Sequence, residues 1–154
     1  MTRSETTSVI KDLLNANWQS TDVTQKDMVI RRGEPADLTT RFGQRNISIE
    51  VVKLKKFGDT LKKTLDADPK DEQVNIHVWQ LVRRKTNEEV EALYDQRELI
   101  EQEIERIVLA NERAIAGIGL GYVGDTDYVD DLESEPPALH AVLHLHCWYE
   151  VVRT

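Results

Sequence analysis

Hydrophobic and polar positions along the chain change period several times, and each period predicts an element. Over residues 4–18, apolar side chains recur at helical spacing and predict a first amphipathic helix. The same spacing returns over residues 86–114 and predicts a second, long helix. Thr86 followed by Glu89 forms a capping box at its start. The apolar stripe of this long helix consists of Val90, Leu93, Tyr94, Ile100, Ile104, Ile107 and Val108.

Alternating patterns between and after the helices predict strands. Residues 28–30 fit a short strand, and residues 46–57 fit a longer one with a bulge near Val51 and Val52. Residues 73–83 alternate most regularly. Loops are expected over the arginine-containing segment 31–45 and the polar segment 58–72, each of which contains a proline.

The C-terminal third predicts a closing pair of strands. Residues 115–123 fit a glycine-containing strand, residues 124–137 an acidic loop, and residues 139–152 a last strand. The elements together predict an α+β fold. A mainly antiparallel sheet would carry the N-terminal helix and the long helix on one face. The 154 residues suffice for one domain spanning 1–154, and no internal repeat or linker divides them.

Composition narrows the function classes. The chain has 28 acidic and 20 basic residues and a net charge of -8, which disfavours non-specific DNA binding as its main task. Cys147 is the only cysteine, so no internal disulfide can form, and a reducing compartment is expected. The start of the chain has no apolar leader, and no apolar run reaches 18 residues, so neither export nor a membrane location is expected.

One face of the last predicted strand carries His140, His144, His146 and Trp148, whereas Cys147 points to the opposite face. An earlier strand places His77 and Trp79 on its polar side. Three interpretations stay open. His77, His144 and His146 could hold a metal ion, the residues could form a half-exposed polar face, or Trp79 and Trp148 could anchor a protein–protein interface.

Charged segments offer a second kind of surface. One set is basic and the other acidic. The basic residues are Arg31, Arg32, Arg41, Arg45, Lys53, Lys55 and Lys56, and the acidic ones are Asp125, Asp127, Asp130 and Asp131. The basic residues could contact phosphates or form ion pairs between subunits, and the acidic loop lacks the spacing of a calcium-binding EF-hand. No catalytic motif or cofactor fingerprint is present, so the chain is not expected to be an enzyme.

The order of elements resembles the tail-terminator, or tail-completion, proteins of long-tailed phages and related archaeal tailed viruses. Four segments, distributed over nearly the whole chain, carry this resemblance: 9–14 (VIKDLL), 74–79 (VNIHVW), 88–110 and 143–151 (LHLHCWYEV). It implies a tail-terminator-like fold and a homo-oligomeric, hexameric ring at the head-proximal end of the tail tube. That ring would end tail polymerisation and join the tail to the head connector.

The same resemblance implies its partners and location. These are other copies of the chain, the tail tube protein and the head-connector or neck proteins, with genome DNA passing through the lumen without specific binding. The location would be the virion tail or neck, and the host cytoplasm during assembly. The resemblance carries no catalytic residues and no cofactor. Another neck component, such as a head-completion or connector adaptor, is the first alternative. A histidine-based metal protein and a salt-sensitive nucleic-acid-binding protein are the others.

Overall fold

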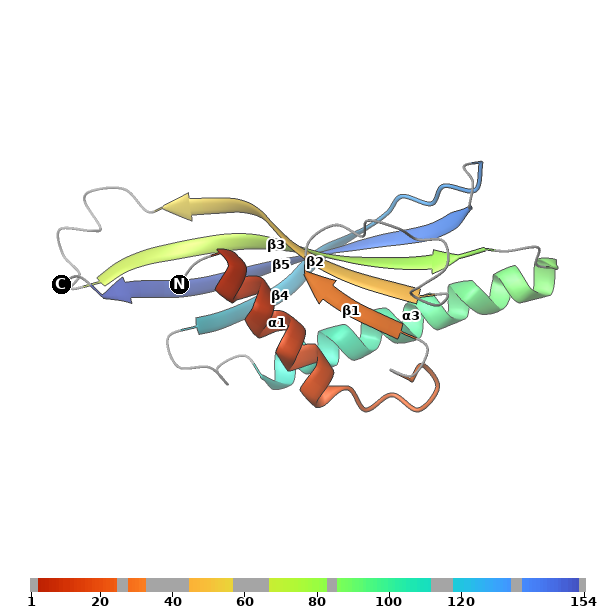
Figure 1. The fold of residues 1–154 in the computed structure, drawn as a ribbon, viewed down its shortest axis with the longest axis horizontal. Helices are drawn as coiled ribbons and strands as arrows, with labels where there is room; N and C mark the ends of the chain where they lie inside the picture. The colour runs from red at the N-terminus through yellow and green to blue at the C-terminus, as the bar shows by residue number, and fades with distance from the viewer. Residues whose placement is uncertain are drawn as a thin grey trace.

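Two helices cover one face of a five-stranded sheet in a computed structural model (Figure 1). The structure describes residues 3–24, 28–32, 45–56, 67–82, 86–111, 118–133 and 137–152. The helices are α1 (Arg3–Asn17) and α3 (Asn87–Ala110). The strands are β1 (Met28–Arg32), β2 (Arg45–Lys56), β3 (Ala67–Leu81), β4 (Ile118–Tyr128) and β5 (Ala138–Val152). This arrangement confirms the predicted α+β fold with both helices on one side of the sheet.

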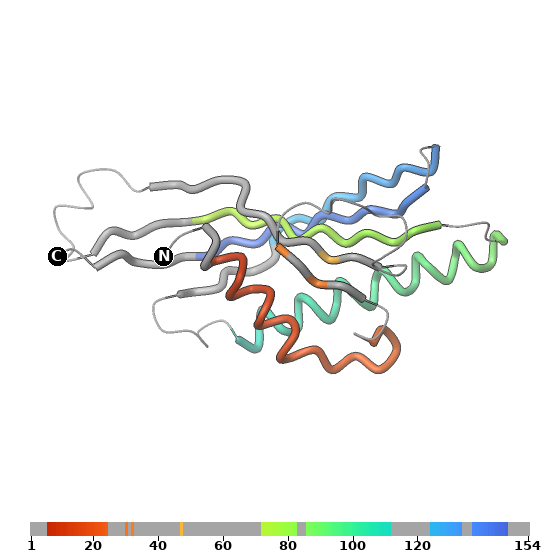
Figure 2. The backbone as a smooth tube through the Cα atoms, in the orientation of Figure 1, coloured from red at the N-terminus to blue at the C-terminus, as the bar shows by residue number. Residues whose placement is uncertain are grey.

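The strand order is β1-β2-β3-β5-β4, so β1 and β4 form the two edges. β1 runs parallel to β2, and the other neighbouring strands are antiparallel. The centre is the β3–β5 pair, which stays in register from Ala67 opposite Val152 to Leu81 opposite Ala138. The predicted bulge in β2 is confirmed by a register shift between Val51 and Lys53. Figure 2 shows how the twisted strands fan out, with the β4–β5 hairpin leading away from α1.

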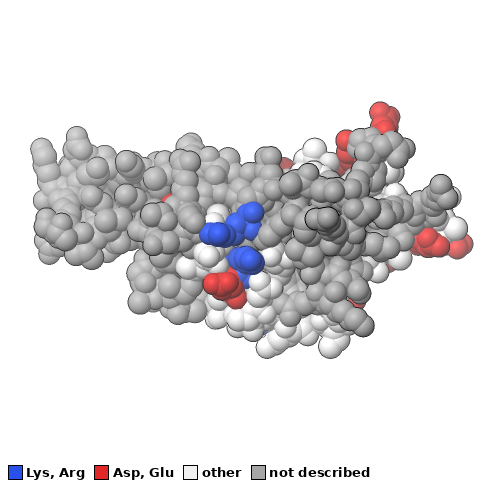
Figure 3. All heavy atoms as spheres, viewed as in Figure 1, with Lys and Arg blue, Asp and Glu red and all other residues white. Residues whose placement is uncertain are grey.

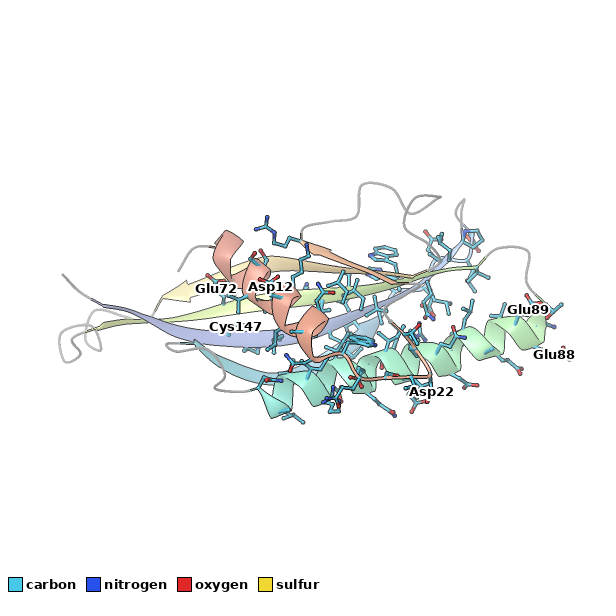
Figure 4. The ribbon with its side chains drawn as sticks, turned by 60° about the horizontal axis from the view of Figure 1, so that its bottom comes forward. Asp12, Asp22, Glu72, Glu88, Glu89 and Cys147 are labelled. Atoms are coloured by element: carbon cyan, nitrogen blue, oxygen red, sulfur yellow. The ribbon has the colours of Figure 1, made fainter. Side chains whose placement is uncertain are left out.

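The core lies between the helices and alternate residues of the central strands. Its members share one sheet face or one helix stripe. They include Ile10, Leu13 and Leu14 of α1, Val74, Ile76 and Val78 of β3, Ile100, Ile104, Ile107 and Val108 of α3, and Ala141, Leu143, Leu145 and Cys147 of β5. α1 packs against β1 and β2, and α3 packs against β3 and β4. Figure 4 shows Glu72 and Cys147, which face each other across β3 and β5, in the region that α1 crosses. No helix in the described part of the chain is long and apolar enough to span a membrane.

A polar junction joins the end of α1 to α3. Glu103 accepts a hydrogen bond from the backbone N–H of Gln19 at 2.9 Å and pairs with Arg106 at 2.5 Å. Arg106 also donates to the carbonyl oxygen of Asn17 at 2.7 Å. The hydrogen bond from Arg106 holds the pKa of the Glu103 carboxyl below its ordinary value, and Gln19 adds to this effect.

The predicted loop over residues 58–72 is wrong in its second half, because β3 begins at Ala67. The charged sequence ADPKDE has little strand propensity, but its backbone finds a ladder along the end of β5. Tertiary pairing therefore overrides local preference. Pro69 lies one residue beyond Lys70, the last residue of β3 that pairs with β2, so β3 has a partner strand on one side only at this proline.

Two other predicted loops also contain strand. Arg31 and Arg32 complete β1, and Arg45 begins β2. β4 continues to Tyr128, so Asp125 and Asp127 lie in a strand and not in the acidic loop. An edge strand accommodates these carboxylates because their side chains remain exposed.

The ends of α3 are set by side-chain caps. The hydroxyl of Thr86 accepts a hydrogen bond from the backbone N–H of Glu89 at 3.3 Å, which confirms the Thr86 half of the predicted capping box. The helix ends at Ala110, four residues before the predicted end. Asn111 stops it by donating from its side-chain amide to the Ile107 carbonyl oxygen at 2.8 Å.

Candidate functional site

The sheet face opposite the helices carries a stack of three aromatic rings. The Trp79 and His140 rings lie 3.6 Å apart between centroids with an interplanar angle of 12°. His77 lies beside this pair, with its ring centroid 5.1 Å from that of His140 and 6.5 Å from that of Trp79, and its Nδ1 lies 2.8 Å from His140 Nε2. Register explains the stack, because Trp79 faces His140 directly across β3 and β5. The predicted shared face of His77, Trp79 and His140 is confirmed, but Trp79 is half-buried and one face of its ring is occupied.

A polar recess of about 470 Å³ lies farther along the same face. Its lining comes from three strands and consists of Gln73, Gly124, Asp125, Asp127, His144 and His146. His144 is held in place by two neighbours, with Nδ1 2.8 Å from the Asn75 Oδ1 and Nε2 2.8 Å from the Asp127 Oδ2. The recess can therefore offer the carboxylates of Asp125 and Asp127 to a polar or cationic group that approaches the β4 edge.

The metal-binding hypothesis used His77, His144 and His146. In the structure, His77 pairs with His140, and His144 pairs with Asn75 and Asp127. Across the described ranges, no group of three His, Cys, Asp or Glu side chains is placed to hold a metal ion. The three histidines therefore share a face without converging on one point.

An arginine clamp joins α3 to the β4–β5 hairpin. Arg97, whose side chain is 10% exposed, donates from Nη1 to the Asp130 Oδ1 at 2.6 Å. Its guanidinium carbon lies 4.4 Å from the Tyr128 ring centroid and 5.0 Å from that of Tyr94. Asp130 Oδ1 also accepts from the backbone N–H of His140 at 2.9 Å. The clamp therefore fixes the hairpin on the long helix by charge-assisted and cation–π contacts.

Glu101 completes this clamp. The Tyr128 hydroxyl donates to Glu101 Oε2 at 2.9 Å, and Arg97 Nε lies 4.0 Å from Glu101 Oε1. Burial raises the pKa of the Glu101 carboxyl above its ordinary value, although the Tyr128 hydrogen bond and Arg97 oppose this. Burial, followed by the contact with Glu101, also raises the pKa of Tyr128.

Sequence reasoning missed Arg97, although it carries the clamp. Arg97 lies four residues after Leu93 and three before Ile100, so it falls on the apolar stripe of α3. A charged residue at a stripe position indicates a buried partner, and that signal was available in the sequence. The contact of Tyr128 with Arg97 could not be predicted from the sequence, because residues 124–137 were expected to form a loop.

Charge is divided between the two sides of the sheet. β1 and β2 together carry six arginine or lysine residues and one glutamate, Glu50. From the start of β4 to residue 133 there are five acidic residues and no basic one. α3, which packs beside β4, adds eight acidic residues against two basic ones. Strand order places these sets at opposite edges, so the subunit has a basic edge (β1 and β2) and an acidic edge (β4, residues 129–133 and α3).

Most of the predicted interface residues fall on these two edges. Arg31, Arg32, Arg45, Lys53, Lys55 and Lys56 lie on the basic edge, and Asp125, Asp127, Asp130 and Asp131 lie on the acidic one. Figure 3 shows acidic side chains gathered at the right-hand end of the molecule, where the β4–β5 hairpin and the start of α3 lie in Figure 1. Figure 4 labels Glu88 and Glu89 at that start. Trp148 is in β5 opposite Asp71, with its side chain outside the described part, and Arg41 lies outside the described residues.

Comparison with known proteins gives no match at the family level. No protein-family model matches the chain, and no curated protein sequence matches it significantly.

Proposed function

We propose that this chain is a structural subunit of a tailed virus. It forms a homo-oligomeric ring of six copies that terminates the tail tube and connects the tail to the head. The order of its helices and strands, which resembles tail-terminator proteins, supports the class. The separation of charge between opposite edges of the sheet supports the ring.

The two oppositely charged edges support a ring because a ring needs two different contact patches on each subunit. A heterologous, head-to-tail contact uses one patch on each subunit to meet the other patch on its neighbour, and it closes when the rotation allows. A basic edge at β1 and β2 and an acidic edge at β4 and α3 provide such a pair. Like-charged contacts between two acidic edges would repel, so charge also opposes a symmetric dimer through that edge.

The metal-binding alternative receives no support from the described residues, because His77 pairs with His140, His144 pairs with Asn75 and Asp127, and no group of three metal-ligating side chains comes together there. The alternative, a head-completion or connector adaptor, would also form a ring. That ring would differ from a tail terminator in the structure that it caps. The functional experiment must therefore measure tail length and not oligomerisation alone.

The test is assembly of the tail tube protein encoded by the same genome, with and without this chain. We expect added chain to cap the tubes, shorten their length distribution and appear as a ring at one end in electron micrographs. The chain with Arg32→Glu and Lys53→Glu, which reverses charge on the basic edge, serves as the matched variant and should cap poorly. Tubes that grow to the same lengths and carry no terminal ring would overturn the proposal.

A further inference from the structure

The tip of the β4–β5 hairpin, residues 128–133, displays large apolar side chains in water. Tyr128, Val129 and Leu132 are 55%, 56% and 50% exposed, respectively. They account for three of the five exposed large apolar side chains in the described part of the chain, and the other two are Tyr94 and Leu109. Clustered apolar exposure of this kind is typical of a protein interaction site, whereas single exposed residues are ordinary.

Hydrogen bonds hold the backbone of residues 129–131 against β5. Asp131 and Ala138 exchange two backbone hydrogen bonds of 2.9 and 2.8 Å, and Val129 N–H donates to the His140 carbonyl oxygen at 2.8 Å. The Arg97–Asp130 clamp holds the same turn from the helix side. The backbone at Val129 and Asp131 is therefore held in place before a partner binds, which lowers the entropy lost on binding.

Charge around the tip identifies the kind of partner it fits. Asp130, Asp131 and Glu133 lie between or beside the apolar residues, and no basic residue occurs from 118 to 133. Charge complementarity therefore favours a basic partner surface. β2 of this chain supplies basic residues at its end, where Lys53, Lys55 and Lys56 follow one another within four positions and Val52 and Leu54 flank the first of them.

We infer that the hairpin tip is the anchor of the contact between subunits, and that its occupant is the β1–β2 edge of a second copy of this chain. This inference rests on the proposed ring and adds which residues supply its affinity. Tyr128, Val129 and Leu132 contribute the apolar contact, while the surrounding carboxylates select the basic edge and set the orientation. The tip takes the anchoring role that the sequence had suggested for Trp79 and Trp148.

The test compares the full-length chain with Val129→Ser plus Leu132→Ser by analytical ultracentrifugation over a wide concentration range. The matched control is Leu109→Ser, which removes an exposed apolar side chain of 66% exposure near the other end of α3. We expect the tip variant to need about a hundredfold more protein to assemble, since each truncated anchor costs about tenfold. The control should assemble like the unmodified chain, and all three should give the same circular dichroism spectrum.

The outcomes separate the two proposals. If the unmodified chain assembles and the tip variant assembles equally well, the anchor is wrong and the ring stands. An unmodified chain that stays monomeric at every concentration also overturns the anchor, while the tube-length assay still decides the function. Equal losses in the tip variant and in Leu109→Ser would show a general effect of surface polarity and would also refute the anchor.

Discussion

Replacement of Arg97 by methionine tests the clamp that positions the hairpin. Methionine retains an unbranched apolar stem and removes the guanidinium group. The lost hydrogen bond to Asp130 involves two charged groups, and such bonds contribute about 1.5–3 kcal/mol. The contacts with Tyr128 and Tyr94 add about 0.5–1 kcal/mol each. Asp130 is 24% exposed and can be partly rehydrated, so the expected net loss is about 2–3 kcal/mol.

The assay is urea unfolding at neutral pH, combined with amide hydrogen exchange. A loss of this size in the free energy of unfolding, in a chain of 154 residues, would also lower the Tm in a thermal melt by about 5–10 °C. Exchange should accelerate at Val129 and His140, whose N–H groups donate within the hairpin. A double-mutant cycle with Asp130→Asn should give a coupling energy above about 1 kcal/mol. A loss below about 0.5 kcal/mol, or no coupling, would refute the clamp.

Three further predictions concern the folded chain. Glu103→Gln should flatten the acid side of the stability–pH curve. The pKa of the Glu103 carboxyl in the folded chain lies below its ordinary value of 4.5, so its ionised form stabilises the fold above that pH. This stabilisation is lost as the pH falls through the folded pKa. An unchanged acid midpoint of unfolding in urea titrations would contradict the prediction. Ile104→Ala should cost about 2–5 kcal/mol because the side chain is fully buried, as measured by calorimetry. Thr86→Ala should cost about 1 kcal/mol and leave the core intact, whereas Thr86→Ser should be nearly neutral.

The sequence predicted the elements better than their ends. Within the described residues, periodicity identified helices α1 and α3 and strands β1 to β5, because the apolar stripes and alternations that it detects are the surfaces that form the core. The errors fall where pairing with a distant strand decides the structure. The segment starting at Ala67 becomes strand because β5 is long enough to pair with it, and β4 continues to Tyr128 because β5 offers a partner there.

The sequence allowed us to predict which residues share a surface, but not which of them contact one another. Strand parity correctly placed His77, Trp79 and His140 on one face, since side chains alternate in any strand. Their stacking depends on register between β3 and β5, which is set by residues far apart in the sequence. The same holds for Arg97 and Asp130, which are separated by 33 positions and meet only after the hairpin packs on α3.

The most direct test of the head-to-tail contact is the mass of a mixture of two damaged subunits. One carries Arg32→Glu and Lys53→Glu on the basic edge, and the other carries Val129→Ser and Leu132→Ser at the tip. Each retains one working patch. At the lowest concentration at which the unmodified chain assembles, we expect each variant alone to be monomeric and the mixture to form one-to-one dimers that cannot close a ring. A mixture that stays as monomeric as its parts, or single variants that assemble as the unmodified chain does, would contradict it.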